Sequence, residues 1–267
     1  MQKSYSTDGY RPLSGLSTVL TIVFGVLIAV QALYILLGLV AVATPDWVID
    51  LDDEAPIPVM YMFIGVVAML EIVLRVATIV VFLIWEHRAY KNLYALRATY
   101  LAHSPGWAVG WWFIPFANLV KPYVVMKEIW RESEPEVDPD SGFLSSAVGV
   151  PGFFAIWWAA WIIGNIMARI TERASENPDG TISDVFPVLL AISSLITGIA
   201  AILVVHIVRQ ITQRQETRYQ NLGAPPVEAP PPPPDFGYRP QPAPGGYSDP
   251  APSADHDAPE SRDLRND

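Results

Sequence analysis

The stretch SPGWAVGWWFIPFANLVKPYVVMKEIWRE, residues 104–132, decides how the rest of the chain is arranged. It is apolar enough to enter a membrane, and it holds four of the nine tryptophans of the chain. Two prolines, Pro115 and Pro122, interrupt it, and Asn118 and Lys121 add polar groups. Whether this stretch crosses the bilayer determines on which side every later segment lies.

The composition indicates a membrane protein. The 267 residues are 51% hydrophobic and 16% charged, whereas a soluble domain carries about 25% charged residues. The formal net charge of −10, without a basic face, argues against nucleic acid as a partner. The chain has no cysteine, which excludes disulfides, thiol catalysis and thiolate metal sites.

Four apolar segments predict four transmembrane helices, at about residues 16–43, 59–85, 150–168 and 186–208. Helices of this length suit a hydrocarbon core of about 30 Å. The expected organisation is a cytoplasmic N-terminus (1–15), a membrane domain (16–222) and a disordered proline-rich tail. The tail (223–267) holds 13 of the 25 prolines and too few apolar residues to fold.

The basic residues favour four spans over five. If 106–126 crossed the membrane, the termini would lie on opposite sides, with a basic cluster outside. With four spans, only Arg169 and Arg173 lie outside, together with the acidic loop Thr44–Pro58, and both termini are cytoplasmic. The residues then inside are Lys3, Arg11, Arg88, Lys91, Arg97, Lys121, Lys127, Arg131, Arg209, Arg214, Arg218 and three tail arginines.

The stretch 105–132 is therefore interpreted as a re-entrant or interfacial amphipathic segment that joins two helical hairpins of an all-α integral membrane protein. Helical spacing gives it an apolar face, formed by Phe116, Leu119, Tyr123, Met126 and Trp130. The opposite face carries Asn118, Lys121, Glu128 and Glu132. A helix with such faces is expected in the plane of the membrane interface.

Glu71 and Arg75 are a pair of charges near the middle of the second apolar segment. Charges at this depth are costly and mark ion or proton pathways. Four residues apart on one helical face, they can also neutralise each other and fix the helix register. We favour this second interpretation, because an acid already paired with an arginine is a weak proton carrier.

Small residues at helical spacing predict close packing between helices or a homo-oligomer. They are Ala160, Gly164 and Ala168, with Ser194 and Gly198 in the last helix and Gly25 and Ala29 in the first. The sequence contains no HExxH, Walker, GxSxG or EF-hand motif. We therefore expect no enzyme, no cofactor and no metal site.

The residues around the central stretch resemble a known family. The string SPGWAVGWWFIPFANLVKPYVVMKEIWRES, with WEHRAYKNL before it and WWAAWIIGNI and VVHIVRQITQRQ after it, is similar to the bacterial membrane family described as domain of unknown function 4328. The resemblance covers roughly residues 60–220. It implies a multi-pass protein of the bacterial cytoplasmic membrane, and it brings no activity, substrate or catalytic residue.

The expected function is that of a non-enzymatic membrane protein that acts through interaction or membrane organisation. Its partners would be the lipid bilayer and a protein that binds the proline-rich tail. The alternative is a small transporter or channel that uses the Glu71/Arg75 pair and the broken 105–122 segment. The candidate functional or structural residues are Glu71, Arg75, Trp111, Trp112, Pro115, Asn118, Lys121, Pro122, Tyr123 and Trp130.

Overall fold

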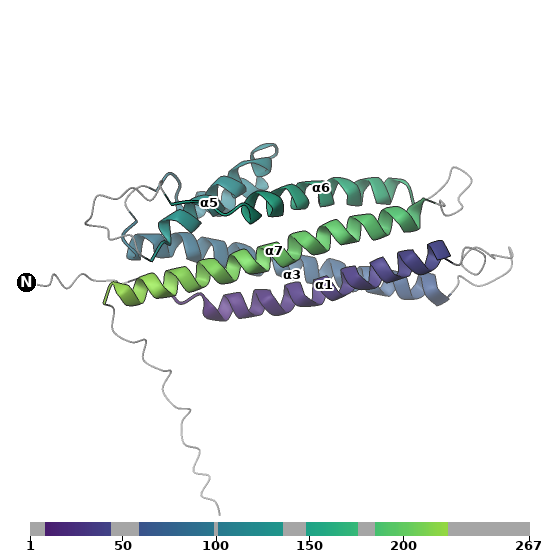
Figure 1. Ribbon diagram of the computed structural model, residues 1–267, viewed down its shortest axis with the longest axis horizontal. Coiled ribbons are helices and arrows are strands. Elements are labelled where there is room, and N and C mark those ends of the chain that lie inside the picture. Colours follow the sequence, from purple (N-terminus) through teal and green to yellow (C-terminus); the bar gives the residue numbers. More distant parts are fainter. Residues whose placement is uncertain (1–8, 44–58, 99–100, 136–147, 176–184, 224–267) are drawn as a thin grey trace, which may run out of the picture. The chain divides into compact units, whose positions relative to one another are not determined.

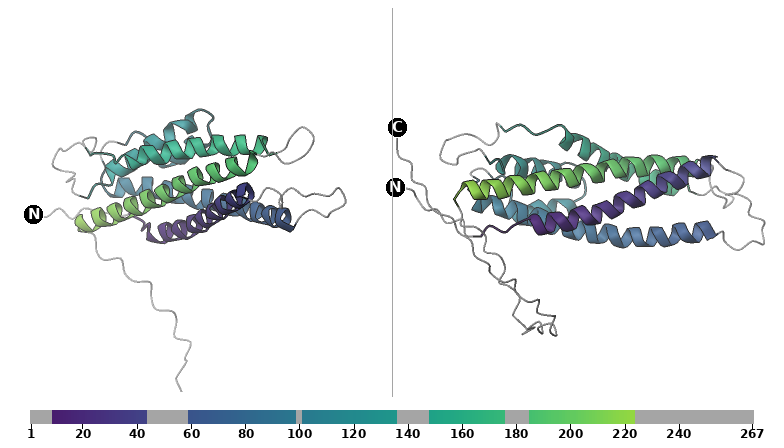
Figure 2. Two further views of the ribbon diagram at one scale, coloured as in Figure 1. Left: turned by 45° about the vertical axis from the view of Figure 1, so that its right-hand side comes forward. Right: turned by 60° about the horizontal axis from the view of Figure 1, so that its bottom comes forward.

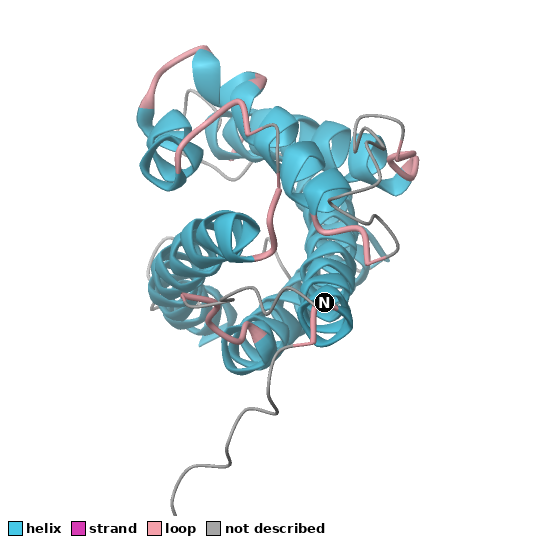
Figure 3. Cartoon of the chain, turned by 90° about the vertical axis from the view of Figure 1, so that its left-hand side faces the viewer, coloured by secondary structure: helices cyan, strands magenta, loops and turns pink. Residues whose placement is uncertain are grey.

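The structure, a computed structural model, describes residues 9–43, 59–98, 101–135, 148–175 and 185–223 (Figure 1). Within these ranges the regular structure is helical and contains no strand (Figure 3). The predicted all-α class is therefore confirmed. The acidic loop 44–58 and nearly all of the predicted tail, 224–267, lie outside the described residues.

In the described part of the chain, four helices are long and apolar enough to cross a membrane, as predicted: α1 (Ser14–Ala43), α3 (Val59–Ala95), α6 (Phe153–Arg173) and α7 (Phe186–Asn221). Helix α6 begins later than expected because Pro151 and Gly152 precede it. Helices α3 and α7 continue well beyond the predicted ends at 85 and 208, since no proline or glycine interrupts the polar residues that follow. With 37 and 36 residues, each is about 55 Å long, more than a bilayer core requires.

Close contacts at small residues set the packing order of these helices. Helix α7 packs on α1 and α6, and α1 packs on α3, whereas α3 and α6 are not a packed pair. A Cβ added at Gly38 of α1 would lie 2.6 Å from the carbonyl oxygen of Pro187. Gly164 similarly meets Thr197, and Gly198 meets Gln31. These glycines therefore serve contacts within the chain, and the long helices lie side by side (Figures 1 and 2).

The central stretch is not a fifth span. It forms four short pieces: α4 (Pro105–Gly110), the 3-10 turns η1 (Trp111–Phe113) and η2 (Ala117–Leu119), and α5 (Lys121–Glu132). Ser104 caps α4, because its hydroxyl accepts a hydrogen bond from the Trp107 amide at 3.4 Å. Phe116, between the two prolines, has a φ of 64° and breaks the helical path. The pieces pack against the C-terminal half of α3.

The expected faces of this stretch require a correction. The helix begins at Lys121, so Phe116 and Leu119 lie outside it and are 85% and 45% exposed. Met126 and Trp130 are buried, and Trp130 contacts Phe154 of α6 and Arg214 of α7. Glu132, expected on the polar face, is buried as well. The reason is that protein covers α5 on more than one side, which the spacing of one helix does not reveal.

Among the described residues, the fully buried side chains concentrate toward one end of the long helices. We call this the basic end; residues 86–98, 121–135 and 209–223 gather there, as the hydrogen bond from Arg218 Nη1 to the Glu132 carbonyl at 2.9 Å shows. The fully buried side chains in and next to these ranges include Trp85, Tyr90, Leu93, Val125, Met126, Ile129, Ile207, Val208 and Ile211. Farther along α3, Val66, Met69 and Val73 are 63–68% exposed. Such apolar exposure suits contact with lipid.

Candidate functional site

A cavity of about 430 Å³ lies between the four long helices and continues into the space between α3 and α6. We call it the α3–α6 groove. It exists because α3 and α6 do not pack on each other, while α1 and α7 form its floor. Trp112 and Phe113 of η1 also line it. Its volume falls in the range of small-molecule binding sites, about 300–1,000 Å³.

The two ends of the groove differ in polarity. The contacts of Gln31 with Glu71 and with Gly198 show that these three residues lie at the same height along the axis of the bundle. At that level, farther from the basic end, the lining includes Gln31, Arg75, Asn165 and Thr197. Nearer the basic end it is mainly apolar and aromatic: Phe24, Phe82, Leu83, Trp112, Phe113, Trp157 and Val204. The groove is thus amphipathic along its length.

At the polar level, Glu71 and Arg75 form the ion pair that their spacing predicts. Glu71 Oε1 accepts hydrogen bonds from Arg75 Nε at 2.8 Å and Nη2 at 2.5 Å. It accepts a third from Gln31 Nε2 of α1 at 2.9 Å. The Glu71 side chain is only 11% exposed, whereas that of Arg75 is 49% exposed. The carboxylate is therefore held between two helices, and the guanidinium faces the groove.

Arg75 retains unused hydrogen-bonding capacity. A guanidinium has five N–H donors, and Arg75 directs two of them at Glu71. No further hydrogen bond of Arg75 is present among the described residues. Arg75 lies ten residues ahead of Trp85, the last residue of the apolar run, hence about 15 Å away along α3. This is mid-depth for a hydrocarbon core of about 30 Å.

Trp112 is held in place at the other end of the groove. Its Nε1 donates a 2.7 Å hydrogen bond to Glu86 Oε2, and Glu86 is completely buried. The indole ring also makes edge contacts with Phe82, Trp158 and Trp161 at centroid distances of 5.6–5.9 Å. The second oxygen of Glu86, Oε1, has no hydrogen-bond partner among the described residues. Sequence reasoning missed Glu86, because it opens a charged run that is typical of a solvated helix.

The other candidate residues of the central stretch lie at the basic end, outside the groove. Trp111 contacts Trp107 and His103, and the ammonium of Lys121 lies 5.1 Å from its ring centroid. The remaining residues shape the segment and its contacts with α6. Pro115 lies between η1 and η2, and Asn118 is the middle residue of η2. Pro122 is in the first turn of α5, Tyr123 stacks on Trp158, and Trp130 donates to the Gly149 carbonyl.

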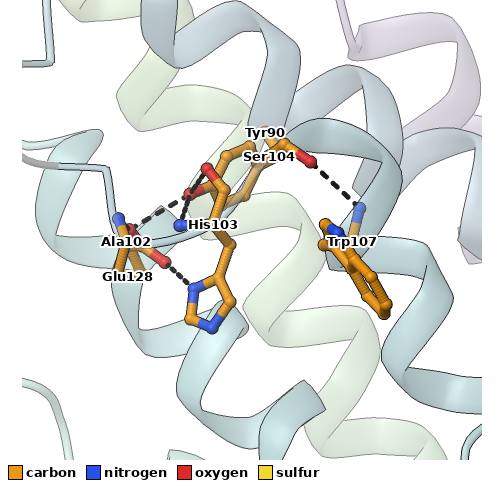
Figure 4. Close-up of polar contacts among 6 residues, drawn as sticks. All are labelled: Tyr90, Ala102, His103, Ser104, Trp107 and Glu128. Atoms are coloured by element: carbon orange, nitrogen blue, oxygen red, sulfur yellow. Dashed lines mark hydrogen bonds and ion pairs between the residues drawn. The ribbon is translucent and has the colours of Figure 1, made fainter.

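A second polar cluster, which the sequence did not predict, joins α3, the 101–104 turn and α5 (Figure 4). The Glu128 carboxylate accepts a hydrogen bond from the Ala102 amide at 2.5 Å and lies 2.7 Å from His103 Nδ1. The Tyr90 hydroxyl accepts from the His103 amide at 2.9 Å and lies 2.8 Å from the His103 carbonyl oxygen. These contacts satisfy the backbone of a tight turn, so the cluster is a structural clamp.

A third network ties α7 to the rest of the basic end. Gln215, fully buried, donates to the Ala89 carbonyl at 2.9 Å and to the Ser133 hydroxyl at 3.0 Å. Arg218 donates to the carbonyl oxygens of Leu96 and Glu132. Across the described ranges, no group of three or more His, Asp or Glu side chains is placed to hold a metal ion. The α3–α6 groove is therefore the candidate functional site.

Comparison with known proteins identifies the family of the chain. The family model described as "Domain of unknown function (DUF4328)" matches residues 51–213, more than half of the sequence. The chain belongs to this family, which confirms the resemblance seen in its residues. No curated protein and no solved structure matches it. The matched range includes α3, α6 and the central stretch, whereas α1 precedes it.

Proposed function

We propose that this member of the family is a non-catalytic membrane protein that binds a lipid-like molecule in the α3–α6 groove. The observation that carries the proposal is the groove itself, a cavity of about 430 Å³ between two helices that do not pack on each other. Its lining is mainly apolar at one end and polar at the other, as an amphiphile requires. Such a role belongs to the broader class of membrane-organising proteins that the sequence favours.

The energetics of binding differ from those of a water-filled pocket. A hydrocarbon chain that moves from the bilayer into an apolar groove gains no hydrophobic free energy, because lipid tails are equally apolar. Affinity must then come from packing against fixed side chains and from polar contacts. Trp112 supplies a fixed surface through Glu86, and Arg75 supplies a polar contact through Glu71. The groove thus has a source of selectivity at each end.

The orientation that we propose follows from the distribution of basic residues. The basic end would face the cytoplasm of a bacterium, in the cytoplasmic membrane, with both termini on that side. The proline-rich tail would there be available to a protein partner, and a homo-oligomer through helix faces remains part of the proposal. The basic residues found at this end of the described structure support the assignment.

Transport of the bound molecule is the second candidate. What favours it is that Arg75, from the intramembrane pair, and Trp112, from the broken segment, line one groove although 37 positions separate them in the sequence. Movement toward the basic end would require Trp112 to leave Glu86 and its aromatic neighbours. Flux of a labelled lipid in proteoliposomes tests this candidate. If Trp112→Ala abolishes the flux, or leaves it equal to that of the unchanged protein, the protein is not a transporter of this kind.

Lipid retention tests the leading proposal. We expect the full-length protein, washed extensively in a mild detergent, to retain about one lipid-like molecule per chain, measured by mass spectrometry of an organic extract. Ala160→Phe should reduce retention at least roughly ten-fold, because Ala160 lines the groove. The matched control is Ala159→Phe, at an exposed neighbour that does not line it. No retained lipid, or equal loss in both variants, would refute the proposal.

A further inference from the structure

We infer that the polar end of the groove selects an uncharged amphiphile whose polar group is a hydrogen-bond acceptor of the carbonyl type, with Arg75 as the donor. This inference rests on the proposed function and names the chemical class of the ligand. It follows from three features of the described structure. They are the unused donors of Arg75, the charge balance around Glu71 and the direction of the apolar lining.

The first feature is that Arg75 needs an acceptor at a depth where the bilayer provides none. Its side chain is 49% exposed, about 15 Å from the end of the apolar run, with two of its five donors used. Polar groups that lack a partner in hydrocarbon are costly, and a lipid tail cannot satisfy them there. A molecule in the groove that offers an acceptor removes this penalty.

The second feature is that the site is already electrically neutral. Glu71 balances Arg75, and Gln31 donates to the same carboxylate oxygen, so Glu71 stays fixed when a ligand approaches. An anionic ligand would leave a net negative charge at mid-depth, and burying such a charge is strongly penalised. An ester, amide or ketone oxygen accepts from a guanidinium and keeps the site neutral. The charge balance therefore favours an uncharged acceptor.

The third feature sets the direction of the ligand. From Arg75 the groove leads toward the basic end, past Phe82 to Trp112 and Phe113. The lining of α6 runs from Trp157 to Ala168, about 16 Å by helical rise. A hydrocarbon chain would follow this wall, with its acceptor at Arg75. A helix of a second copy fits less well, because its backbone carbonyls already accept hydrogen bonds within that helix.

Three probes of equal chain length test the inference on the full-length protein in detergent. They are a stearate methyl ester brominated at mid-chain, the alkane brominated at the same place, and a permanently charged sulfonate with the same brominated chain. Bromine quenches nearby tryptophans, and Trp112, Trp157 and Trp161 all line the groove. We expect saturable quenching by all three probes, with the ester binding roughly ten-fold or more tightly than either other probe.

Variants assign this preference to Arg75. In the double variant Glu71→Gln with Arg75→Met, which leaves no unpaired charge and no donor at position 75, the ester should bind within about two-fold of the alkane. If the double variant does not fold, Arg75→Lys takes its place. It keeps the ion pair but has fewer donors, so it should reduce the preference for the ester in part. Thr18→Val is the control, since Thr18 does not line the groove and its hydroxyl is bonded to the Ser14 carbonyl. It should leave the preference unchanged.

Each other outcome overturns the inference in a distinguishable way. Equal affinity for ester and alkane would refute the acceptor requirement while lipid binding stands. Tightest binding of the sulfonate would identify an anionic lipid as the ligand. A concentration-dependent dimer that protects the tryptophans would identify a second copy as the occupant. Absence of saturable quenching by every probe would refute the proposed function as well.

Discussion

At the scale of single residues, buried polar side chains decide which features of this bundle are rigid. Glu86 illustrates the point, because a completely buried carboxyl group holds the indole of Trp112 at the end of the groove. Glu71 plays a comparable part for Arg75 at the other end. In both cases an acid positions a larger side chain that lines the groove. Substitutions of these acids should therefore act through the side chain that they hold.

Substitution at Glu86 separates hydrogen bonding from charge. Glu86→Ala should lower the free energy of unfolding by about 1–3 kcal/mol, because it leaves the Trp112 N–H buried without an acceptor. Glu86→Gln should change the stability little, since an amide oxygen still accepts this bond in place of the carboxyl group. Thermal unfolding in detergent, followed by near-UV circular dichroism, measures both. Equal destabilisation by the two variants would show that the charge itself is required.

Gly38 and Gly25 form a matched pair on α1. Gly38→Ala should destabilise the protein by about 1–3 kcal/mol, because the new Cβ would lie 2.6 Å from the Pro187 carbonyl oxygen and push α1 from α7. Gly25→Ala, where no atom lies within 4 Å, should be neutral or slightly stabilising. The midpoint of thermal unfolding is the measurement. Equal midpoints for both variants would contradict the tight contact.

At the scale of elements, the basic end is densely packed and cross-linked by polar side chains, as the core of a soluble domain is. Helices α3 and α7 extend past their apolar runs, and α5 packs between α3 and α6. Polar side chains cross-link these elements: Gln215 bonds to Ala89 and Ser133, and Glu128 bonds to the 101–104 turn. This region holds η1, and through it Trp112, against the end of the groove. Its integrity should govern how well the groove is closed there.

Hydrogen exchange can test the clamp of the 101–104 turn. Glu128→Ala should speed exchange of the Ala102 and His103 amides, because the first loses its acceptor and the second depends on a Tyr90 hydroxyl beside the same carboxylate. We expect a loss of about 1–3 kcal/mol of local stability. Lys91→Ala, an exposed position on the same helix as Tyr90, serves as control. Unchanged exchange in Glu128→Ala would show that the turn is held by other contacts.

At the scale of the whole molecule, four membrane-length helices and one broken segment make a bundle with an unfilled space on one side. The helices pack in the order α3, α1, α7, α6, so α3 and α6 each pack on one neighbour but not on each other. Of the small residues expected at helix contacts, Gly164 and Gly198 meet neighbouring helices inside the chain, as Gly38 also does, whereas a Cβ added at Gly25 would meet no atom within 4 Å. Closing the space between α3 and α6 therefore falls to side chains, to lipid or to a ligand.

Topology can be mapped directly because the chain has no cysteine. With single cysteines introduced by Lys91→Cys, Lys127→Cys and Arg173→Cys, an impermeant maleimide added to intact cells should label only Arg173→Cys. The other two should react only after the membrane is opened, because the basic end faces the cytoplasm in the proposed orientation. Labelling of Lys127→Cys from outside would refute the four-span arrangement.

Sequence alone determined the class of this protein, the four spans, the broken character of residues 104–132 and the Glu71/Arg75 pair. These features depend on local properties, namely apolar length, proline positions, basic-residue distribution and the four-residue spacing on a helix. Only the tertiary structure decided that Arg75 and Trp112 line one groove, that Glu86 holds Trp112 and that Glu132 is buried. The physical reason is that the residue pattern of one helix does not specify which other segments pack against its faces. Burial and hydrogen bonding between distant segments arise only when the helices pack. Here the groove exists because α3 and α6 do not pack on each other.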